Sequence, residues 1–594
     1  MLEAHFRAIL AQVAEDRPDL EMRLAAEALG AWKPRDLRPF SRPVQPHNVT
    51  LPNVMALAGA GFVVEEVSAP LAADPDDFLR EISRLAHDVL DIREPNYGAA
   101  ALRTTPSQPD LYVVAPSFYA FVYEGGLNLP SGKAGVPARN LLQMMRRQTG
   151  YQLKGGGKTW LAILEDQLAM ALLDIRRREL DFQVVAAGLA AAGTLSATIR
   201  LPAAVNRVQG AIRQMAAHAR SGKAGHARKL VKLFAEVQSR LVAEIGPQLL
   251  PVIERSQTGV KLVTDVPLEW LPVGGLPLML RKNVSRITTT PGNLMTGVLA
   301  RSELIHLDRD AFREILVVSA IEPGDPICDI LTDMLAAWAP AYGDQVHVRI
   351  VKARSRADLV AALNDFQGAV MVFDGHGGHD RLSGVAVLRV GTEDVSVWDL
   401  RTEIRVPPVV ILSACDTQAA DRSHATTANA FLTAGAVTVL GSLLPVDARN
   451  SALLIARLIW RLAEFLPMIT GESGRAVLWS EVMGGMLRLH LLFDLLQPQI
   501  ERGAITSDQY AQINLAAIIA TAHQEEGWWE GALHSLGALL DISDEAVEAM
   551  GRDTIARSDA IRYVQIGNPE LIVFKSRALL RAAGYDVADR KDLS

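Results

Sequence analysis

Apolar and polar positions alternate in blocks between residues 314 and 466. Short runs rich in valine and isoleucine, such as EILVVSA at 314–320 and GAVMVFDG at 368–375, precede stretches in which apolar residues recur every three or four positions. The first pattern predicts strands buried on both faces, and the second predicts helices. Strands and helices in strict turn predict a mostly parallel sheet covered by helices on both faces, with right-handed connections.

The same reading gives the order of elements in this part of the chain. The predicted strands are 314–320, 345–351, 368–375, 407–415 and 436–442, and the predicted helices are 328–339, 355–366, 424–435 and 449–466. The run VAVLRVGTEDVSVWDL (385–400) predicts a hairpin at the side of the sheet. A last strand is expected within 561–574, after a mainly helical insertion at about 471–559.

The first 257 residues have a different pattern of apolar and polar positions. The first thirty predict a helix, DLYVVAPSFYAFVYEGG (110–126) predicts one or two strands, and apolar spacing from Trp160 onward predicts further helices. The uncharged stretch 182–199 is rich in alanine and glycine, which favours a closely packed helix or helical hairpin over a membrane span. The predicted division is a mixed α/β region (1–150), a helical region (151–257), an α/β domain (258–574) and a C-terminal tail (575–594).

Composition and charge narrow the class of protein. The chain has 594 residues, 49% of them apolar and 21% charged, with a net charge of -7. This balance gives no strong nucleic-acid signal, although short basic runs occur. Two cysteines cannot build a disulfide framework, and the charged start lacks the apolar core of a signal peptide. We therefore expect a cytoplasmic protein with no membrane association.

Reactive residues follow two of the predicted strands. One strand leads into Asp374-Gly375-His376-Gly377, and the next long strand leads into Ser413-Ala414-Cys415-Asp416. Sites in open α/β sheets form at the carboxyl ends of the strands, so neighbouring strands would bring the imidazole and the thiol together. The imidazole can remove the thiol proton and return it to a leaving amine. The amides of Gly377 and Cys415 are candidate oxyanion-hole donors.

Each feature has a plainer explanation when taken alone. A cysteine at a strand end is commonly a small buried apolar residue, and His-Gly after a strand is commonly a turn. The two together on successive strand ends of one sheet favour a catalytic pair. Cys328, at a predicted helix start, is interpreted as structural.

Four segments resemble a known family. FDGHGG, VVILSACDTQ and AGAVTVLGSLLPVDARNSALLIARL resemble three blocks of the CHAT family of caspase-like proteases, in the family's order and spacing. VTDVPLEWLPVGGLPLMLRKNVSRITTTP resembles the start of such domains. The resemblance covers about 258–465. It implies a caspase-like three-layer sandwich with His376 as base, Cys415 as nucleophile and no cofactor. Leu444 stands where relatives often have tryptophan.

The resemblance also suggests where a substrate binds. The region of Asp447 lines the pocket for the substrate side chain before the cut in related folds, and a carboxylate there suits arginine or lysine. Asp447 can equally cap the following helix. Asp416 and His379 are further candidate substrate-binding residues, although Asp416 can be a turn residue and His379 a polar loop residue near the cleft.

The functional hypothesis is therefore a cysteine endopeptidase acting on a protein or peptide. Relatives join such domains to sensor regions in bacterial defence systems, which implies regulation by the N-terminal region, a protein partner or self-association. Two alternatives remain: a catalytically silent scaffold for protein interactions, and a thiol hydrolase or acyltransferase acting on another kind of substrate.

Three other site motifs are rejected. KGGGKT (154–159) has Gln152 where a phosphate-binding loop needs glycine, and GHGGHD has Asp380 where a dinucleotide-binding turn needs glycine. His379 and His424 lie near the candidate pair without the spacing of a metal site, so no metal is expected.

Overall fold

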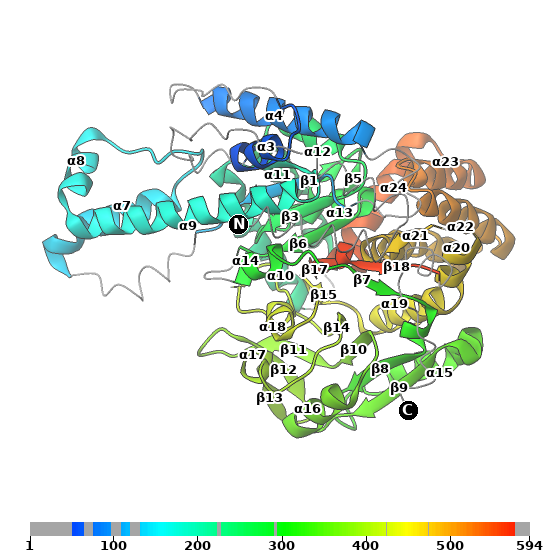
Figure 1. Ribbon diagram of the computed structural model, residues 1–594. Helices are drawn as coiled ribbons and strands as arrows, with labels where there is room; N and C mark the ends of the chain where they lie inside the picture. The colour runs from blue at the N-terminus through cyan, green and yellow to red at the C-terminus, as the bar shows by residue number, and fades with distance from the viewer. Residues whose placement is uncertain are drawn as a thin grey trace, which may run out of the picture.

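The computed structural model describes most of the chain and shows one large sheet at its centre (Figure 1). The described residues are 50–64, 75–96, 108–118, 131–221, 227–289, 294–422, 424–472 and 475–576. The helix expected within the first thirty residues and nearly all of the C-terminal tail lie outside these ranges.

The central sheet has ten strands and is almost entirely parallel. In spatial order the strands are β2 (Ala197–Arg200), β1 (Leu111–Ala115), β3 (Val260–Thr264), β6 (Val284–Ile287), β17 (Tyr563–Gly567), β15 (Thr438–Ser442), β14 (Val409–Ser413), β10 (Val370–Asp374), β8 (Glu314–Ser319) and β9 (His347–Lys352). The pair β15 and β17 is antiparallel, and the other neighbouring pairs are parallel. This arrangement confirms the predicted mostly parallel sheet.

The direction of the strands reverses once, between β15 and β17. The strands on the two sides of this junction follow the same order, β2-β1-β3-β6 on one side and β9-β8-β10-β14 on the other. In each half, the second strand along the chain lies at the edge of the sheet, outside the first. Strands before and after residue 257 therefore belong to one continuous sheet. The N-terminal region is not separate from the sheet that carries the candidate site.

The half of the sheet after residue 300 follows the predicted alternation. Its helices are α15 (Ile330–Tyr342), α16 (Arg356–Asp365), α18 (Thr427–Ala434) and α19 (Ala448–Trp460). Ser355 caps α16, because its hydroxyl accepts a hydrogen bond from the amide of Asp358. Every residue of β10 is buried, as expected for a strand covered on both faces. The core packs against both faces of this sheet.

The predicted side hairpin is a three-stranded antiparallel sheet. Its strands are β11 (His376–His379), β12 (Ala386–Val390) and β13 (Glu393–Val395), and His379 pairs with Ala386. His376 and His379 are therefore the first and last residues of a strand and not members of an irregular turn. This pairing fixes the direction in which the chain leaves β10.

A buried ion pair links two parallel strands, β3 and β17, on the N-terminal side of the reversal in the main sheet. Lys261 on β3 and Glu570, just after β17, are each almost fully buried, with their nitrogen and oxygen 2.5 Å apart. The Lys261 ammonium also donates to the carbonyl of Gly567 and the hydroxyl of Ser285, at 2.6 and 3.0 Å. These contacts satisfy charges that would be costly to bury alone.

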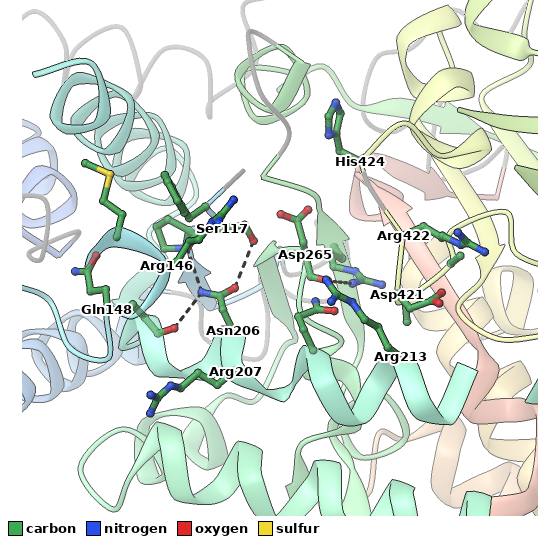
Figure 2. Close-up of a pocket in the computed structure, with 18 of the residues that line it drawn as sticks. Ser117, Arg146, Gln148, Asn206, Arg207, Arg213, Asp265, Asp421, Arg422 and His424 are labelled. Carbon is green, nitrogen blue, oxygen red and sulfur yellow. Dashed lines mark hydrogen bonds between the residues drawn. The ribbon is translucent and has the colours of Figure 1, made fainter. Parts of the chain in front are cut away.

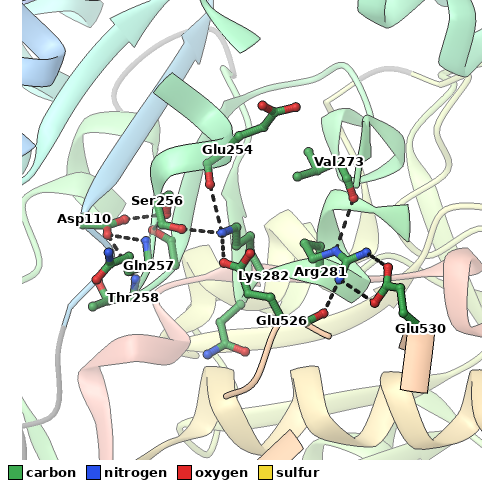
Figure 3. Close-up of polar contacts among 12 residues, drawn as sticks. Asp110, Glu254, Ser256, Gln257, Thr258, Val273, Arg281, Lys282, Glu526 and Glu530 are labelled. Atoms are coloured by element: carbon green, nitrogen blue, oxygen red, sulfur yellow. Dashed lines mark hydrogen bonds and ion pairs between the residues drawn. The ribbon is translucent and has the colours of Figure 1, made fainter. Parts of the chain in front are cut away.

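The predicted helical insertion is present and packs on the N-terminal half of the sheet. It contains α21 (Trp479–Glu501), α22 (Ser507–Ala522), α23 (Trp528–Leu540) and α24 (Asp544–Arg557). Figure 3 shows Arg281 and Lys282, which precede β6, bound to Glu530 and Glu526 of this insertion. The insertion is thus attached to residues nearly 250 positions earlier.

The chain after β17 ends in a second, smaller sheet. The expected last strand is divided into β17 and β18 (Ile572–Phe574), and β18 pairs with β16 (Val477–Leu478) and β7 (Ile305–Leu307). The sequence pattern did not separate these two strands, because both are buried and apolar.

Helices dominate the described N-terminal region. They include α3 (Thr50–Gly59), α4 (Pro75–Asn96), α7 (Val136–Arg146), α8 (Gly157–Glu165), α9 (Gln167–Ala192), α10 (Gln209–Ser221), α11 (Ala227–Ile245) and α12 (Leu250–Arg255). The α7–α8 arm projects away from the main sheet (Figure 1).

The uncharged stretch 182–199 differs from its predicted form. It completes α9 and then turns into strand β2, because Ala197–Arg200 pair with β1. Tertiary pairing here overrides the local preference for a helix. The stretch is therefore a helix followed by a strand, and the alternative of a helical hairpin is wrong. Across the described residues, none of the helices combines the length and apolar character needed to cross a bilayer.

Candidate functional site

The register of two neighbouring strands brings the predicted residues together. Strands β10 and β14 are parallel, with Asp374 opposite Ser413. The amide of Gly375 donates to the carbonyl of Ser413 at 3.2 Å, and the Ser413 hydroxyl donates to Asp374 at 3.2 Å. His376 and Cys415 each lie two residues beyond this matched pair. The chain therefore leaves both strands at the same edge of the sheet.

Gly377 makes the closest approach between the two strand ends. A Cβ atom added at this position would overlap the carbonyl oxygen of Cys415. Only glycine allows β11 to lie against the backbone at Cys415 in this way. Gly377, whose amide is a candidate oxyanion-hole donor, is therefore also required by the close packing of β11 on the backbone of Cys415.

His376 is oriented by a carboxylate from a third strand end. Its ring is about half exposed, and Nε2 lies 2.9 Å from Oδ2 of Asp325. Asp325 follows β8, the other neighbour of β10. The amide of Ile327 and the His376 ring hold the pKa of Asp325 below its usual value, so this carboxylate is ionised at neutral pH. A proton on Nε2 leaves Nδ1 as the basic nitrogen.

Asp325 was missed by the sequence analysis. It stands in EPGDP, immediately after the predicted strand 314–320, and has no motif of its own. The signal that would have found it is its position after a strand, combined with the order β8-β10-β14. That order was not available from the sequence pattern.

Cys415 lies in a partly buried position with its thiol protonated. The sulfur lies 3.8 Å from the carbonyl oxygen of Val446, to which the S–H group donates. Burial raises the pKa of the thiol above its ordinary value, and Asp416 adds to this effect. Among the described contacts, none is a hydrogen bond between Cys415 and His376. The two side chains thus share one edge of the sheet, each with a different polar partner.

The residue after Cys415 is fixed by the N-terminal region. Asp416 has a φ of 57°, which is uncommon for a residue other than glycine. Arg220 on α10 binds both carboxylate oxygens of Asp416, at 2.7 and 2.9 Å, and both oxygens of Asp421, at 2.6 and 2.8 Å. These bidentate pairs connect α10 to the segment that begins at Cys415.

Asp447 caps the helix that follows β15. Its Oδ1 accepts hydrogen bonds from the amides of Arg449 and Asn450, at 2.9 and 3.1 Å. The side chain is exposed, and the preceding residue, Val446, contacts the Cys415 thiol. Asp447 is therefore a helix cap beside the candidate nucleophile. Its Oδ2 takes part in none of the hydrogen bonds found among the described residues.

The two remaining histidines lie beside the site without completing a metal cluster. His379 is partly buried, its Nε2 has no hydrogen-bond partner in the described part of the chain, and burial is the main cause of its lowered pKa. His424 lies in a neighbouring cavity. No group of three or more His, Cys, Asp or Glu side chains suited to a metal occurs among the described residues.

Comparison with known proteins identifies the region that carries this site. Residues 327–478 match the family model described as the CHAT domain, which confirms the family resemblance of the strand-end motifs. The match includes His376, Cys415 and Asp447 and excludes the strands before residue 300. Among curated proteins none matches the chain.

Two solved structures show distant similarity. The Arg-specific cysteine proteinase gingipain R of Porphyromonas gingivalis shares 11% identity at a TM-score of 0.28, over 57% of this chain and 71% of that chain. The separase–securin complex of Saccharomyces cerevisiae shares 11% identity at a TM-score of 0.29, over 89% of this chain and 27% of that chain. TM-scores this low do not establish a shared activity.

Asp374 provides a test of the geometry at the strand ends. Burial raises its pKa to about 7, and its Oδ2 has no hydrogen-bond partner in the described part of the chain. The folded protein therefore binds this proton more tightly than the unfolded chain. The resulting stability is complete below the unfolded pKa of about 3.9 and is lost as pH rises through about 7.

We expect Asp374→Asn to remove this pH dependence. Relative to wild type, the free energy of unfolding of the variant should rise by up to about 1.4 kcal/mol per pH unit between about pH 4 and pH 7. Denaturant unfolding of both proteins over this range measures the difference. Asp333→Asn, which replaces an exposed carboxylate on α15, is the control. Parallel pH profiles for Asp374→Asn and wild type would contradict the burial of an ionisable Asp374.

Proposed function

We propose that this chain is a cysteine endopeptidase of the CHAT type that uses Cys415 and His376. The observation that supports it most strongly is the register of β10 and β14, together with the contact of Gly377 on the Cys415 carbonyl. These residues lie within the segment that matches the CHAT domain. A base and a nucleophile at adjacent strand ends suit acyl transfer.

In the proposed reaction, Nδ1 of His376 accepts the thiol proton while Asp325 holds the Nε2–H group. The Cys415 thiolate then attacks the peptide carbonyl carbon and forms a tetrahedral intermediate. Collapse of this intermediate breaks the C–N bond, and His376 gives its proton to the departing amine. Water, deprotonated by His376, then attacks the thioester carbonyl, the C–S bond breaks, and the acid leaves while His376 returns the proton to the Cys415 sulfur. The amides of Gly377 and Cys415 are the proposed donors to the oxyanion.

This reaction requires a change from the resting contacts. The thiol donates to Val446, and its raised pKa keeps it protonated at neutral pH. A substrate that occupies the edge of the sheet would displace the thiol from Val446 and bring it toward the imidazole. The same contacts are compatible with the alternative of a catalytically silent scaffold, so labelling of the thiol is the decisive measurement.

The main experiment uses an electrophilic peptide ending in arginine as a covalent probe of the full chain. We expect wild type to be labelled and to cleave protein substrates, and Cys415→Ala and His376→Ala to do neither. Asp325→Asn should be labelled more slowly than wild type and lose up to roughly 10⁴-fold in kcat/KM, because the wrong tautomer is favoured. Cys328→Ala is the matched control and should behave as wild type. Equal labelling of wild type and Cys415→Ala would defeat the assignment.

We further propose that Asp447 selects a basic residue before the scissile bond. Its Oδ1 caps α19, and its exposed carboxylate can pair with arginine or lysine at the same time. Asp416 is a weaker candidate for this role because Arg220 already binds both of its oxygens. We propose that His379 also lines the substrate-binding side of the candidate site.

Asp447→Asn separates the two functions of this residue, because asparagine is an equally good helix cap but carries no charge. We expect kcat/KM for an arginine peptide to fall by about 10- to 100-fold, the range expected for one lost charged hydrogen bond. The matching norleucine peptide should be cleaved at an unchanged rate, and the melting temperature should stay the same. An equal loss for both peptides would show that Asp447 does not read substrate charge.

The N-terminal region is proposed to control the site through Arg220. Its bidentate pairs hold Asp416 beside the nucleophile, at an uncommon φ. Removing this cation would leave two partly buried carboxylates close together and would shift the segment that contains Cys415. The identity of an external regulator, whether a protein partner or a second copy of the chain, stays a prediction.

For Arg220→Ala we expect about a 10- to 100-fold fall in kcat/KM, the scale associated with small displacements of a catalytic group. Arg220→Lys keeps the positive charge but lacks the paired N–H donors of a guanidinium, so its fall in kcat/KM should be smaller than that of Arg220→Ala. Arg228→Ala, on the neighbouring α11, is the control. Activity equal to or above that of wild type in Arg220→Ala would show that this contact does not position the nucleophile.

A further inference from the structure

A cavity lies beside the candidate catalytic site, between the N-terminal region and the segment after Cys415 (Figure 2). It has a volume of about 750 Å³. One side contains residues after β1 and Arg207, which precedes α10, and the other side contains Arg213 on α10 with residues 418–422 and His424 (Figure 2). Cavities of this size accommodate small organic ligands.

The residues that line this cavity carry more positive than negative charge. Two carboxylates line it, and each is already engaged: Asp265 accepts hydrogen bonds from Thr289, and Asp421 is bound by Arg220. The cations that line it are six arginines: Arg146, Arg176, Arg207, Arg213, Arg286 and Arg422. Two of the six are themselves ion-paired, Arg176 with Glu179 and Arg286 with Glu269. A concave site with more guanidinium than carboxylate groups favours an anionic ligand.

Several of these arginines retain donors for a ligand. The side chains of Arg207, Arg213 and Arg422 are exposed and take part in none of the ion pairs or hydrogen bonds found among the described residues. Figure 2 shows Arg213 and Arg422 on one side of the cavity and Arg207 on the other. A ligand with two separated anionic groups would contact both sides.

The strongest single indication is Arg286 on β6. It is 1% exposed, and its Nη2 has no hydrogen-bond partner among the described residues. Its Nη1 donates to the Asp265 carbonyl at 3.3 Å, and its Nε lies 3.0 Å from buried Glu269. A buried guanidinium nitrogen without a partner is costly, and a phosphate oxygen at the cavity would satisfy it.

We propose that this cavity binds a small molecule that carries at least two phosphate groups. Guanidinium groups match phosphate oxygens in paired geometry, and the apolar wall residues Phe118 and Met145 leave room for an organic portion. The chain's net charge of -7 favours a small ligand over a nucleic acid. The ligand would bridge the N-terminal region and the segment after Cys415. This binding does not depend on the proposed proteolysis.

Calorimetric titration of full-length Cys415→Ala with inorganic tripolyphosphate and with ATP tests this proposal without interference from self-cleavage. We expect saturable binding that weakens as salt rises, because arginine–phosphate contacts are screened. Equal affinity for both probes would indicate recognition of phosphate alone. Tighter binding of ATP would indicate that the organic portion also contacts the wall.

The variants assign the binding to this cavity. Arg207→Ala and Arg213→Ala, each made in Cys415→Ala, should weaken tripolyphosphate binding by about 10-fold or more, the scale of a lost charged hydrogen bond. Arg228→Ala, an exposed arginine outside the cavity, should bind as the parent does. Circular dichroism and melting temperature confirm that each variant is folded.

Three results would overturn the proposal. They are no binding of either probe, equal binding by the cavity variants and their parent, and tighter binding of a single-stranded oligonucleotide with the same dependence on Arg207 and Arg213. The last result would indicate a nucleic-acid site in place of a small-molecule site.

Discussion

The parallel register of β10 and β14 is the constraint on which the candidate site depends. Because Asp374 lies opposite Ser413, the residues two positions farther along each strand emerge at one edge of the sheet. A shift of one residue would exchange the two faces of β14 and move Cys415 away from β11. The contact of Gly377 with the Cys415 carbonyl allows no larger side chain at this position.

The N-terminal region is part of this arrangement because it shares the sheet and supplies side chains to it. The buried pair Lys261 and Glu570 joins β3 to the end of β17, and Arg220 holds Asp416 next to the nucleophile. Local structure at the candidate site therefore depends on residues far outside the segment that matches the CHAT domain. This dependence gives a physical basis for the proposed control of the site by the N-terminal region.

Two electrostatic environments lie close together at this edge. Cys415 and Asp374 are partly or largely desolvated, which favours their protonated forms, whereas Asp325 is exposed to hydrogen-bond donors and stays ionised. A neutral thiol, a histidine whose tautomer is set by a carboxylate, and a neighbouring cationic cavity therefore lie close together on loops at one edge of the sheet. The segment from Cys415 to Arg422 contains the thiol and contributes residues to the cavity.

The sequence alone determined the alternating strands and helices between residues 314 and 466 and the two reactive strand ends, because hydrophobic periodicity and short motifs are local properties. It left open whether Asp447 caps a helix or lines a substrate pocket. Only the tertiary structure decided that Asp325 orients His376, that Arg220 fixes Asp416 from 196 residues away, and that stretch 182–199 ends in a strand. These features depend on which strands become neighbours, and strand order is set by long-range packing that no local pattern encodes.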